Sequence, residues 1–523
     1  MDPISFSLAV VAAADQCIKC GKYLVGKYED YKHAELDVAD AMLKIRSLWL
    51  KTETQLELIT QIWNSIKPRL QELFYDLLGR LRDQLEVAKT RVDRVVAVPD
   101  GAGDRGLTVK KFKAMAYKRR ILQATQDLEA WHSLFDPSWF LIGRMLDPAV
   151  KKHFQDAPQE TSPTGRLSQT REAIRADLNH SDRRGSVFIE RALIAGEHHP
   201  IPFSAAYTAR LTIGDSNVLI DPMASGHGAS LALAKLHVRD LVRRLSASDP
   251  WEFGLLHCRG VVESTEVDDG RRPRFHLVFD IPPTLSGTCH PRTLRDLLLR
   301  KEPHALDQRF QLAKQLVRSV MFVHTSGFVH KSIRPDTIVV FPDTDIGAHF
   351  VIGPSFLIGF ERFRPDGAQT MLAGDTSWEM NLYRHPKRQG LHPEEMYVMQ
   401  HDIYSLGICL LEIALWDSFV LPSPGGLGGA AQPGRELESV AELLLAGKSA
   451  MGVKRALVTM ASDRLPQLMG RRYAELVLAC LTCLDPGETN LFGKQRDLED
   501  EDGIVVGVQY IEKILLRMDE VLI

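Results

Sequence analysis

The residues of this chain that are best placed to do chemistry lie in three segments of its C-terminal half. The first is GFVHKSIRPDTIVVF at 327–341, which follows a helical stretch whose apolar side chains share one face. The second is PSFLIGFERF, and the third is HDIYSLGICLLEIALW, which begins at His401. The reaction to weigh for such loops is phosphoryl transfer. It needs a carboxylate to orient the hydroxyl, an Asp and an Asn to hold magnesium, and a lysine on the phosphates.

These segments resemble motifs of the protein kinases, in the order in which that family has them. Residues 330–337 resemble the catalytic loop H-R-D-L-K-P-x-N, and residues 359–361 resemble the D-F-G turn. LYRHPKR lies near the A-P-E motif, and the helix after 401 resembles D-x-W-S-x-G. Four motifs over about 90 residues imply an α+β, bilobal kinase-like fold for residues 191–523. The residues to which the resemblance gives a fold-holding role are His330, Lys331, Arg334, Pro335, Phe360, Pro386, Asp402 and Gly407.

The residues at the chemical positions of these motifs are not those that the reaction needs. Ser332 replaces the catalytic Asp, Thr337 replaces the metal-binding Asn, and Gly359 replaces the Asp of the D-F-G turn. The strand expected at NVLIDPM has Asp221 roughly where the small lobe would have its lysine. A further strand is expected at FHLVFDI (275–281), and the small lobe has no G-x-G-x-x-G loop. We therefore predict a pseudokinase without a cofactor, although ATP binding without turnover stays open. The alternative is an atypical active kinase that binds ATP and phosphorylates proteins. It would use acidic residues that reach the site from elsewhere, for example Asp336, Asp343 or Glu361.

Residues 1–150 carry helical periodicity and almost no strand pattern. Apolar residues recur every three or four positions over 36–66 and again over 70–95, and Pro68 marks a point where a helix can restart. A further helix is expected over 109–135, ending near Asp136-Pro137 because proline interrupts helical hydrogen bonding. Several long amphipathic helices in sequence predict an antiparallel bundle. The polar residues 151–190 predict a linker or brace, with one short helix around 169–178.

The opening MDPISFSLAVVAAADQCIKCGKYLVGKYEDY and the segment LEAWHSLFDPSWFLIGRM at 128–145 resemble fungal HeLo-like domains, also called prion-inhibition-and-propagation domains. With a kinase-like domain attached, the layout is similar to that of mixed-lineage-kinase-domain-like cell-death proteins. That second likeness is architectural and does not extend to residue identity. Together they imply a bundle that permeabilises membranes once the pseudokinase releases it.

Two features of the bundle sequence fit a membrane role, and each has a plainer alternative. If 4–28 is a helix, it should bury Phe6, Leu8, Val10, Val11 and Ile18. Such a face either packs into the core or lies in a membrane interface and oligomerises. The second feature is a basic run without acidic residues, which suits anionic lipid headgroups or is a solvated helix face. Its members are Lys110, Lys111, Lys113, Lys118, Arg119 and Arg120.

The bulk composition limits the classes of protein to consider. The chain has 523 residues, 45% hydrophobic and 25% charged, which suggests two or three domains. A formal net charge of −3, and a basic run without interleaved aromatics, argue against nucleic acid as a partner. Seven scattered cysteines are too few for a disulfide framework and fit a reducing compartment. The apolar run 8–14 lacks a preceding basic region, so we expect no signal peptide, and no stretch is long enough to span a bilayer.

Cys17-x-x-Cys20 and Cys480-x-x-Cys483 each have the spacing of half a zinc site or a redox pair. Neither pair has neighbouring His or Cys residues to complete four ligands, so we expect buried helix cysteines and no metal.

The sequence as a whole predicts a signalling or cell-death protein with a bundle as effector and a pseudokinase as regulator. Its partners would be an upstream activator, further copies of itself and anionic lipids. It would be cytoplasmic and recruited to the plasma membrane on activation. Besides the atypical kinase, a non-catalytic scaffold remains an alternative, in which both domains bind only proteins.

Overall fold

The computed structural model divides the chain into two compact units, Met1–Arg171 and Glu172–Ile523. The described residues are 3–29, 36–96, 104–144, 186–212, 216–224, 231–264, 274–285, 290–326, 328–342, 351–360, 364–365, 377–390, 393–395, 397–422, 430–447, 449–486, 490, 492, 504–519 and 521. The short helix predicted around 169–178, and the linker residues 151–185, lie outside them.

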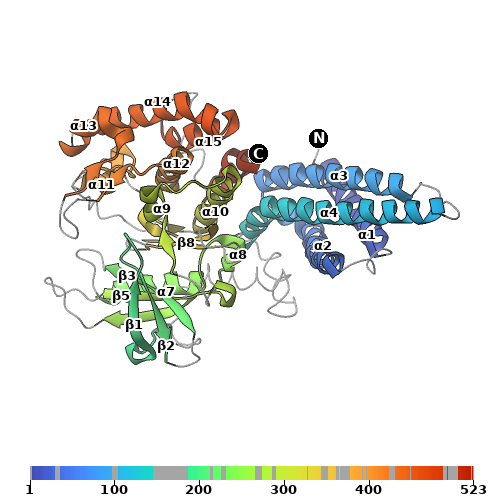
Figure 1. The fold of residues 1–523 in the computed structure, drawn as a ribbon, viewed down its shortest axis with the longest axis horizontal. Helices are drawn as coiled ribbons and strands as arrows, with labels where there is room; N and C mark the ends of the chain where they lie inside the picture. Colours follow the sequence, from blue (N-terminus) through green and yellow to red (C-terminus); the bar gives the residue numbers. More distant parts are fainter. Residues whose placement is uncertain are drawn as a thin grey trace. The chain divides into compact units, whose positions relative to one another are not determined.

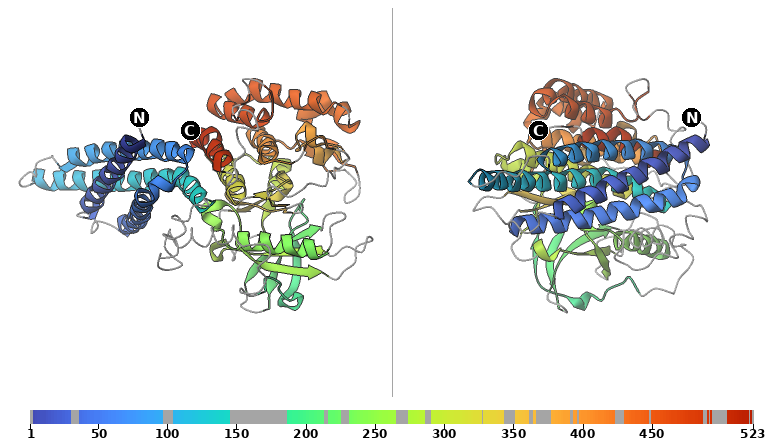
Figure 2. Two further views of the ribbon diagram at one scale, coloured as in Figure 1. Left: turned by 180° about the vertical axis from the view of Figure 1, so that it is seen from behind. Right: turned by 90° about the vertical axis from the view of Figure 1, so that its right-hand side faces the viewer.

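The described part of the first unit is helical. Its elements are α1 (Pro3–Glu29), α2 (Leu36–Ile62), the 3-10 turn η1 (Trp63–Ser65), α3 (Pro68–Val96) and α4 (Asp104–Arg144). Helices α3 and α4 lie side by side, and α1 packs against both α2 and α3 (Figures 1 and 2). The restart at Pro68 is confirmed, because proline lacks the N–H that the first turn of a helix leaves unpaired. Trp63, Phe74, Trp131 and Phe135 are buried, so the unit has an apolar core of its own.

Helix α1 buries a different stripe from the one predicted. Val10, Ala14 and Cys17 are fully buried, whereas Leu8 is 66% exposed and Val11 is 42% exposed. Steps of three or four residues from Val10 define the face that meets α2 and α3, and Leu8 and Val11 fall outside that face. The prediction that both side chains are buried was therefore wrong.

Helix α4 does not end at Asp136-Pro137, as the sequence had suggested, but continues to Arg144 with Pro137 inside it. The residues after the proline explain the difference. Trp139, Leu141 and Ile142 are almost completely buried, so continuing the helix places three large apolar side chains in the core. Burial of that size outweighs the loss of one helical hydrogen bond, which costs about 3 kcal/mol with the ring clash.

The second unit begins with an antiparallel sheet in the order β1-β2-β3-β5-β4. The elements of this small lobe are η2 (Arg191–Leu193), β1 (Ile194–Pro200), β2 (Tyr207–Leu211), β3 (Asn217–Ala224), α7 (Leu231–Leu245), α8 (Pro250–Phe253), β4 (Cys258–Ser264) and β5 (Arg274–Asp280). The predicted strands NVLIDPM and FHLVFDI are β3 and β5. Helix α7 packs against β4.

The rest of the unit is a mainly helical large lobe (Figure 1). Its first elements are η3 (Pro283–Leu285), β6 (Arg292–Thr293), α9 (Leu294–Arg300), α10 (Leu306–Thr325), β7 (Phe328–Val329), η4 (Pro335–Thr337), β8 (Ile338–Pro342), β9 (Ile352–Leu357), β10 (Arg364–Pro365), α11 (Trp378–Asn381), η5 (Pro386–Arg388) and α12 (Met399–Leu415). It continues with β11 (Val420–Leu421), β12 (Gln432–Pro433), η6 (Arg435–Val440), α13 (Ala441–Leu445), α14 (Ala450–Leu468), α15 (Arg471–Leu481), α16 (Ile504–Tyr510), the π-helical turn η8 (Ile511–Leu515) and α17 (Leu516–Asp519).

Helix α12 is buried over nearly its whole length and forms the centre of the large lobe. Helices α10 and α15 pack on it, and the sheet β6-β8-β9 carries the loop that precedes β8. A small lobe built on an antiparallel sheet and a large helical lobe give the second unit a kinase-like bilobal fold. In the described part of the chain, no helix combines the length and apolarity needed to cross a bilayer.

Candidate functional site

An aspartate in the first turn of α12 organises the loop that resembles the catalytic loop. Asp402 accepts hydrogen bonds from the backbone N–H groups of His330 (2.7 Å) and Lys331 (2.9 Å) and from the Tyr397 hydroxyl (2.6 Å). Burial opposes ionisation, but hydrogen bonds led by the one from His324 bring the pKa of Asp402 below its ordinary value. The carboxylate therefore fixes the loop in a conformation where Lys331 has a left-handed φ of 67°.

His330 and Phe360 pack on each other inside the protein. Their ring centroids lie 4.6 Å apart, and both side chains are buried. Burial lowers the pKa of His330 to about 4, so the ring is neutral near pH 7. Phe360 also lies 6.4 Å from Phe279 of β5, which belongs to the small lobe. These two residues connect the lobes and present no group to a substrate.

Ser332 stands at the catalytic-aspartate position, and its hydroxyl is engaged within the loop. Arg334 Nη1 donates to Ser332 Oγ at 2.5 Å, and Arg334 Nε lies 3.3 Å from Asp336 Oδ2. Pro335, between them in sequence, begins η4. A hydroxyl that accepts from a guanidinium is a poor base, because its lone pair is engaged and the adjacent positive charge disfavours uptake of a proton. Ser332 thus cannot take the proton that the kinase aspartate takes.

Thr337 fills the space that a metal-binding side chain at position 359 would need. Gly359 has a φ of +86°, and a Cβ atom built on it would lie 2.3 Å from Thr337 Cγ2. Thr337 Oγ1 donates to the backbone carbonyls of Ser332 (2.7 Å) and Arg334 (3.0 Å). The threonine hydroxyl therefore holds the loop, and the glycine adds no ligand.

Asp221 brings a carboxylate from the small lobe to the same turn. Its Oδ2 accepts a hydrogen bond from Gly359 N–H at 2.8 Å, and the side chain is 3% exposed. Asp221 pairs with Leu277 in the register of β3 and β5, so this bond connects the sheet of the small lobe to the large lobe. A phosphate entering here would meet an anion instead of a lysine.

A buried ion network, absent from the sequence predictions, engages Asp336. Arg295 of α9 donates to Asp336 Oδ1 (3.2 Å), Glu412 Oε1 (3.2 Å), Ser418 Oγ (2.7 Å) and the Tyr383 oxygen (2.8 Å). Burial raises the pKa of Glu412 to about 7, against the pull of Arg295. Asp336 is therefore held by two arginines and is not free to orient a substrate hydroxyl. The other acidic candidates for an active kinase lie outside the described residues: Asp343 and Glu361.

Pro386 begins a short turn of the large lobe, and Gly407 allows two of its helices to pack closely. Pro386 begins η5 after His385, whose Nε2 lies 3.3 Å from the buried amine of Lys454. Burial, followed by the charge of Lys454, lowers the pKa of His385 to about 3. At Gly407 a Cβ atom would lie 2.7 Å from Cys480 Cβ, so glycine permits the close approach of α12 and α15.

The bundle residues proposed for membranes are spread over two helices. On α1, Phe6 is half-buried and packs against Tyr75 (5.2 Å between centroids), whereas Leu8 and Val11 are exposed. On α4, Arg119 is exposed and Lys118 and Arg120 are half-buried. Three lysines of the basic run lie within α4, but their side chains are outside the described part: Lys110, Lys111 and Lys113.

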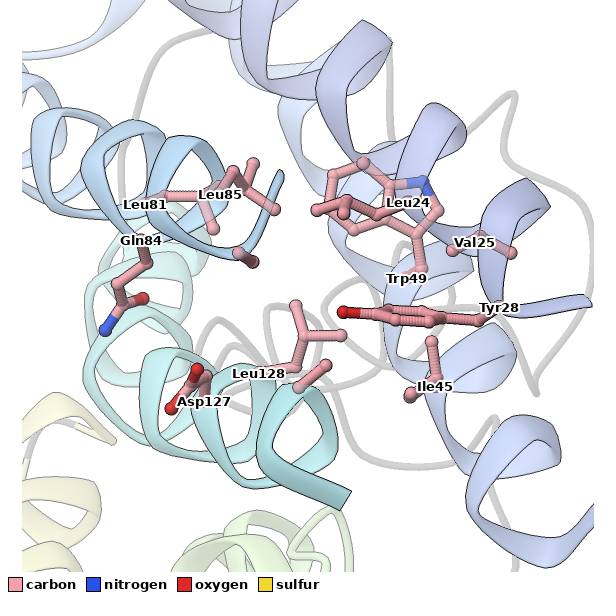
Figure 3. Close-up of a pocket in the computed structure, with 13 residues that line it drawn as sticks. Leu24, Val25, Tyr28, Ile45, Trp49, Leu81, Gln84, Leu85, Asp127 and Leu128 are labelled. Carbon is pink, nitrogen blue, oxygen red and sulfur yellow. The ribbon is translucent and has the colours of Figure 1, made fainter. Parts of the chain in front are cut away.

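An apolar pocket also lies among the four helices of the bundle, lined by residues that include Leu24, Trp49, Leu85 and Leu128. The Tyr28 hydroxyl points into it (Figure 3). Burial raises the pKa of Tyr28 to about 12, so this group is neutral at physiological pH. The lining is mainly apolar, with Tyr28, Gln84 and Asp127 as its polar residues, and this composition suits binding of an apolar group.

The prediction of buried helix cysteines holds for Cys17 and Cys480 but not for the other two, because Cys20 is only half-buried and Cys483 lies in the turn after α15. Among the described residues, no group of three or more His, Cys, Asp and Glu side chains is arranged to hold a metal ion. Burial raises the pKa of the Cys17 thiol to about 12, and Cys483 Sγ donates to the Gln400 carbonyl at 3.2 Å. Neutral, hydrogen-bonded thiols of this kind are unreactive.

The sequence matches no protein-family model and no curated protein. Among solved structures, the chain is similar to the yeast RNA Pol II CTD kinase CTDK-1 complex. The identity is 15% over 47% of this chain and 67% of that one, with a TM-score of 0.28. A TM-score this low carries no weight by itself. The kinase-like fold of the second unit rests instead on its two lobes, the order of its motifs and the contacts of Asp402.

Proposed function

We propose that the kinase-like unit is a pseudokinase that regulates the helical bundle without transferring phosphate. The observation that carries this proposal is the hydrogen bond from Gly359 N–H to the Asp221 carboxylate. In a kinase these two positions supply a magnesium ligand and a phosphate-binding lysine. Here the Gly359 N–H group and the Asp221 carboxylate are hydrogen-bonded to each other, and one residue comes from each lobe.

The residues present do not fit magnesium-bound ATP. Gly359 offers no ligand, and Thr337 Cγ2 leaves no room for one to be added. The Asp221 carboxylate would repel the phosphates at close range. The proposed regulation therefore acts through protein contacts alone.

Nucleotide binding and turnover test this part of the proposal. The melting temperature of the full chain should not change with ATP, with or without magnesium, and labelled ATP should leave no phosphate on generic substrates. The double variant Ser332→Asp, Gly359→Asp should stay inactive, because Thr337 blocks the second aspartate. Incorporation by the parent chain that is lost on changing Ser332 or Glu361 would establish the atypical kinase instead.

We propose further that the bundle is a signalling or cell-death effector that oligomerises on and permeabilises membranes rich in anionic lipid. The exposed side chains of Leu8 and Val11 support this proposal, since they leave an apolar patch at one end of α1. The basic run on α4 supplies the attraction for lipid headgroups. In this scheme an upstream protein activates a cytoplasmic chain, which then moves to the plasma membrane.

A leakage assay with the bundle alone tests the effector. Residues 1–150, which have a core of their own, should release dye from vesicles that contain phosphatidylserine. Leu8→Asp should abolish this leakage. The matched control is Leu50→Asp, because Leu50 on α2 is as exposed as Leu8, at 66%. Leakage that Leu50→Asp abolishes equally would remove the special role of α1.

The basic run is tested in the same assay. Changing Lys110, Lys111, Lys113 and Lys118 together to Glu should weaken binding, as should salt, since exposed charges are screened over about 10 Å at 0.1 M. A folded bundle that ignores these vesicles at low salt would leave the non-catalytic scaffold as the function.

A further inference from the structure

A short segment at the start of the second unit lies along an edge of the small-lobe sheet. We call residues 186–190 the strap. Strand β4 is the last strand in the order β1-β2-β3-β5-β4, so one of its edges has no partner among these strands. Ile189 N–H donates to the Val261 carbonyl at 2.8 Å, and Val261 N–H donates to the Val187 carbonyl at 2.9 Å. Phe188 forms a parallel bridge with Val261, so the strap extends the sheet as a parallel strand.

A glycine in β4 makes room for the strap. A Cβ atom at Gly260 would lie 2.6 Å from the Val187 carbonyl oxygen and 2.7 Å from Ile189 Cδ1. Real Cβ atoms do not approach other atoms so closely. Any other residue at 260 would therefore push the strap away from the edge.

The strap side chains contact both the sheet and α7. Ile189 packs on a core cluster of the sheet that includes Val262. The Phe188 ring lies beneath two cations of α7, with Arg239 Cζ 5.4 Å and Lys235 Nζ 5.8 Å from its centroid. Lys235 also pairs with Glu263 of β4 at 2.8 Å. Cation–π contacts thus connect the strap to the helix that packs on β4.

We propose that the edge of β4 and the adjoining face of α7 form a peptide-docking site, filled by the chain's own residues 187–189. The site takes an extended segment by strand addition, with an aromatic residue between two aliphatic ones. Among the described residues, two backbone hydrogen bonds hold the strap to β4, and the side chains of residues 187–189 are only half-buried, so a competing segment can displace it.

Displacement of the strap has a regulatory consequence, which rests on the function proposed above. Residues 186–190 follow directly on the segment that connects the bundle to the kinase-like unit. A partner protein that offers a Val-Phe-Ile-like strand would take the β4 edge and free the end of the connecting segment. The docking site is thereby an entry point for the upstream activator.

Amide hydrogen exchange of the full chain tests the docking. The amides of Ile189 and Val261 should be protected in the parent, and Gly260→Ala should speed their exchange by at least about tenfold. The Val278 amide on β5 reports whether the sheet stays folded. Gly26→Ala is the matched control, because a Cβ atom at Gly26 meets nothing within 4 Å. Unprotected Ile189 and Val261 in the parent, or unchanged protection in Gly260→Ala, would overturn the proposal.

A variant with a weakened strap allows an added peptide to bind at the docking site. Ile189→Pro removes one of the two donors and alters no residue of the β4–β5 pairing. A fluorescent peptide of residues 185–191, GSVFIER, should bind Ile189→Pro at least tenfold more tightly than the parent, whose site is occupied. The same peptide with alanine in place of its phenylalanine should bind more weakly. Equal binding to parent and variant, or binding to neither, would contradict a site that the strap fills.

Vesicle leakage separates this inference from the proposed function. If the bundle alone causes leakage, Ile189→Pro in the full chain should raise leakage above that of the parent, and no increase would overturn the regulatory role of the strap. If the bundle alone causes none, the effector proposal fails. The docking site is then decided by hydrogen exchange and peptide binding, neither of which depends on leakage.

Discussion

Three buried histidines should make the kinase-like unit lose stability in mild acid. Burial is the main cause that lowers the pKa of His330 to about 4 and the pKa values of His385 and His401 to about 3 each, from an ordinary 6.5. When folding lowers the pKa of a histidine, the protein keeps its full stability above pH 6.5. It loses stability as the pH falls from 6.5 towards the pKa of that histidine in the folded chain. The loss arises because the histidine binds a proton in the unfolded chain but stays neutral in the folded chain.

The size of the loss follows from these pKa values. A pH of 5 is one and a half units below the pKa of a histidine in the unfolded chain. Protonation of the unfolded chain therefore lowers the free energy of unfolding by about 2 kcal/mol for each residue. Three histidines together cost about 6 kcal/mol on this scale. Glu412 acts in the opposite direction, because burial raises its folded pKa from 4.5 to about 7, so its protonation gains stability between pH 7.5 and 5. That gain is about 2 kcal/mol and leaves a net loss of about 4 kcal/mol.

A single variant isolates one histidine from all other titrating groups. His385→Gln keeps a hydrogen-bonding side chain but cannot take up a proton. Relative to the parent, the free energy of unfolding of this variant should be about 2 kcal/mol larger at pH 5 than at pH 7.5, because the variant escapes the acid-induced loss. Urea titrations of the full chain measure this difference, with the exchange of α12 amides as the signal for unfolding of the kinase-like unit. His198→Gln changes an exposed histidine and should give no such difference. If His385→Gln and the parent differ in free energy of unfolding by the same amount at pH 5 and at pH 7.5, the assignment of a neutral, buried ring is refuted.

Two further predictions concern close packing and metals. Gly407→Ala should destabilise the kinase-like unit by about 1–3 kcal/mol in urea titrations, because its Cβ atom would overlap Cys480 Cβ. Cys480→Gly should recover part of that loss, whereas Cys258→Gly, distant in the small lobe, should not. Elemental analysis of the purified chain should find no stoichiometric zinc, since neither Cys-x-x-Cys pair completes four ligands. About one zinc per chain, lost on Cys480→Ser, would contradict this.

The parts of the fold that the sequence predicted depend on short, contiguous patterns. The strands β3 and β5, the helix α10 and the buried helix α12 each carry their periodicity within one segment, so neighbouring residues suffice to identify them. The catalytic-loop segment was recognisable for the same reason, because its residues lie within a dozen positions of each other.

The errors come from contacts between distant residues. The exposure of Leu8 depends on which side of α1 meets α2 and α3, and the periodicity of one apolar helix did not settle this. The continuation of α4 through Pro137 depends on burial of Trp139 and Ile142 by other helices. Local rules for proline describe an isolated helix and omit that tertiary gain.

The Arg295 network was missed because its members lie far apart in sequence. One indication was present: Glu412 interrupts the apolar run CLLEIALW, and a carboxylate in a buried helix requires a cation or hydrogen-bond donors. The sequence does not say which of many arginines supplies the charge. The strap was missed for a similar reason, since residues 186–190 fall in a polar region that suggested only a linker.

The changes at the degenerate site depend on one another, and this explains why single repairs should fail. Gly359 at φ +86° is compatible with Thr337 against it, and Thr337 in turn supports the backbone of Ser332 and Arg334. The free N–H of Gly359 then requires an acceptor, which Asp221 provides. Restoring an aspartate at 359 would displace Thr337 and bring a second carboxylate beside Asp221, where like charges in a buried site repel. On the pseudokinase proposal, the absence of catalysis and the contact between the lobes are therefore one structural feature, and gaining the chemistry would require breaking that contact.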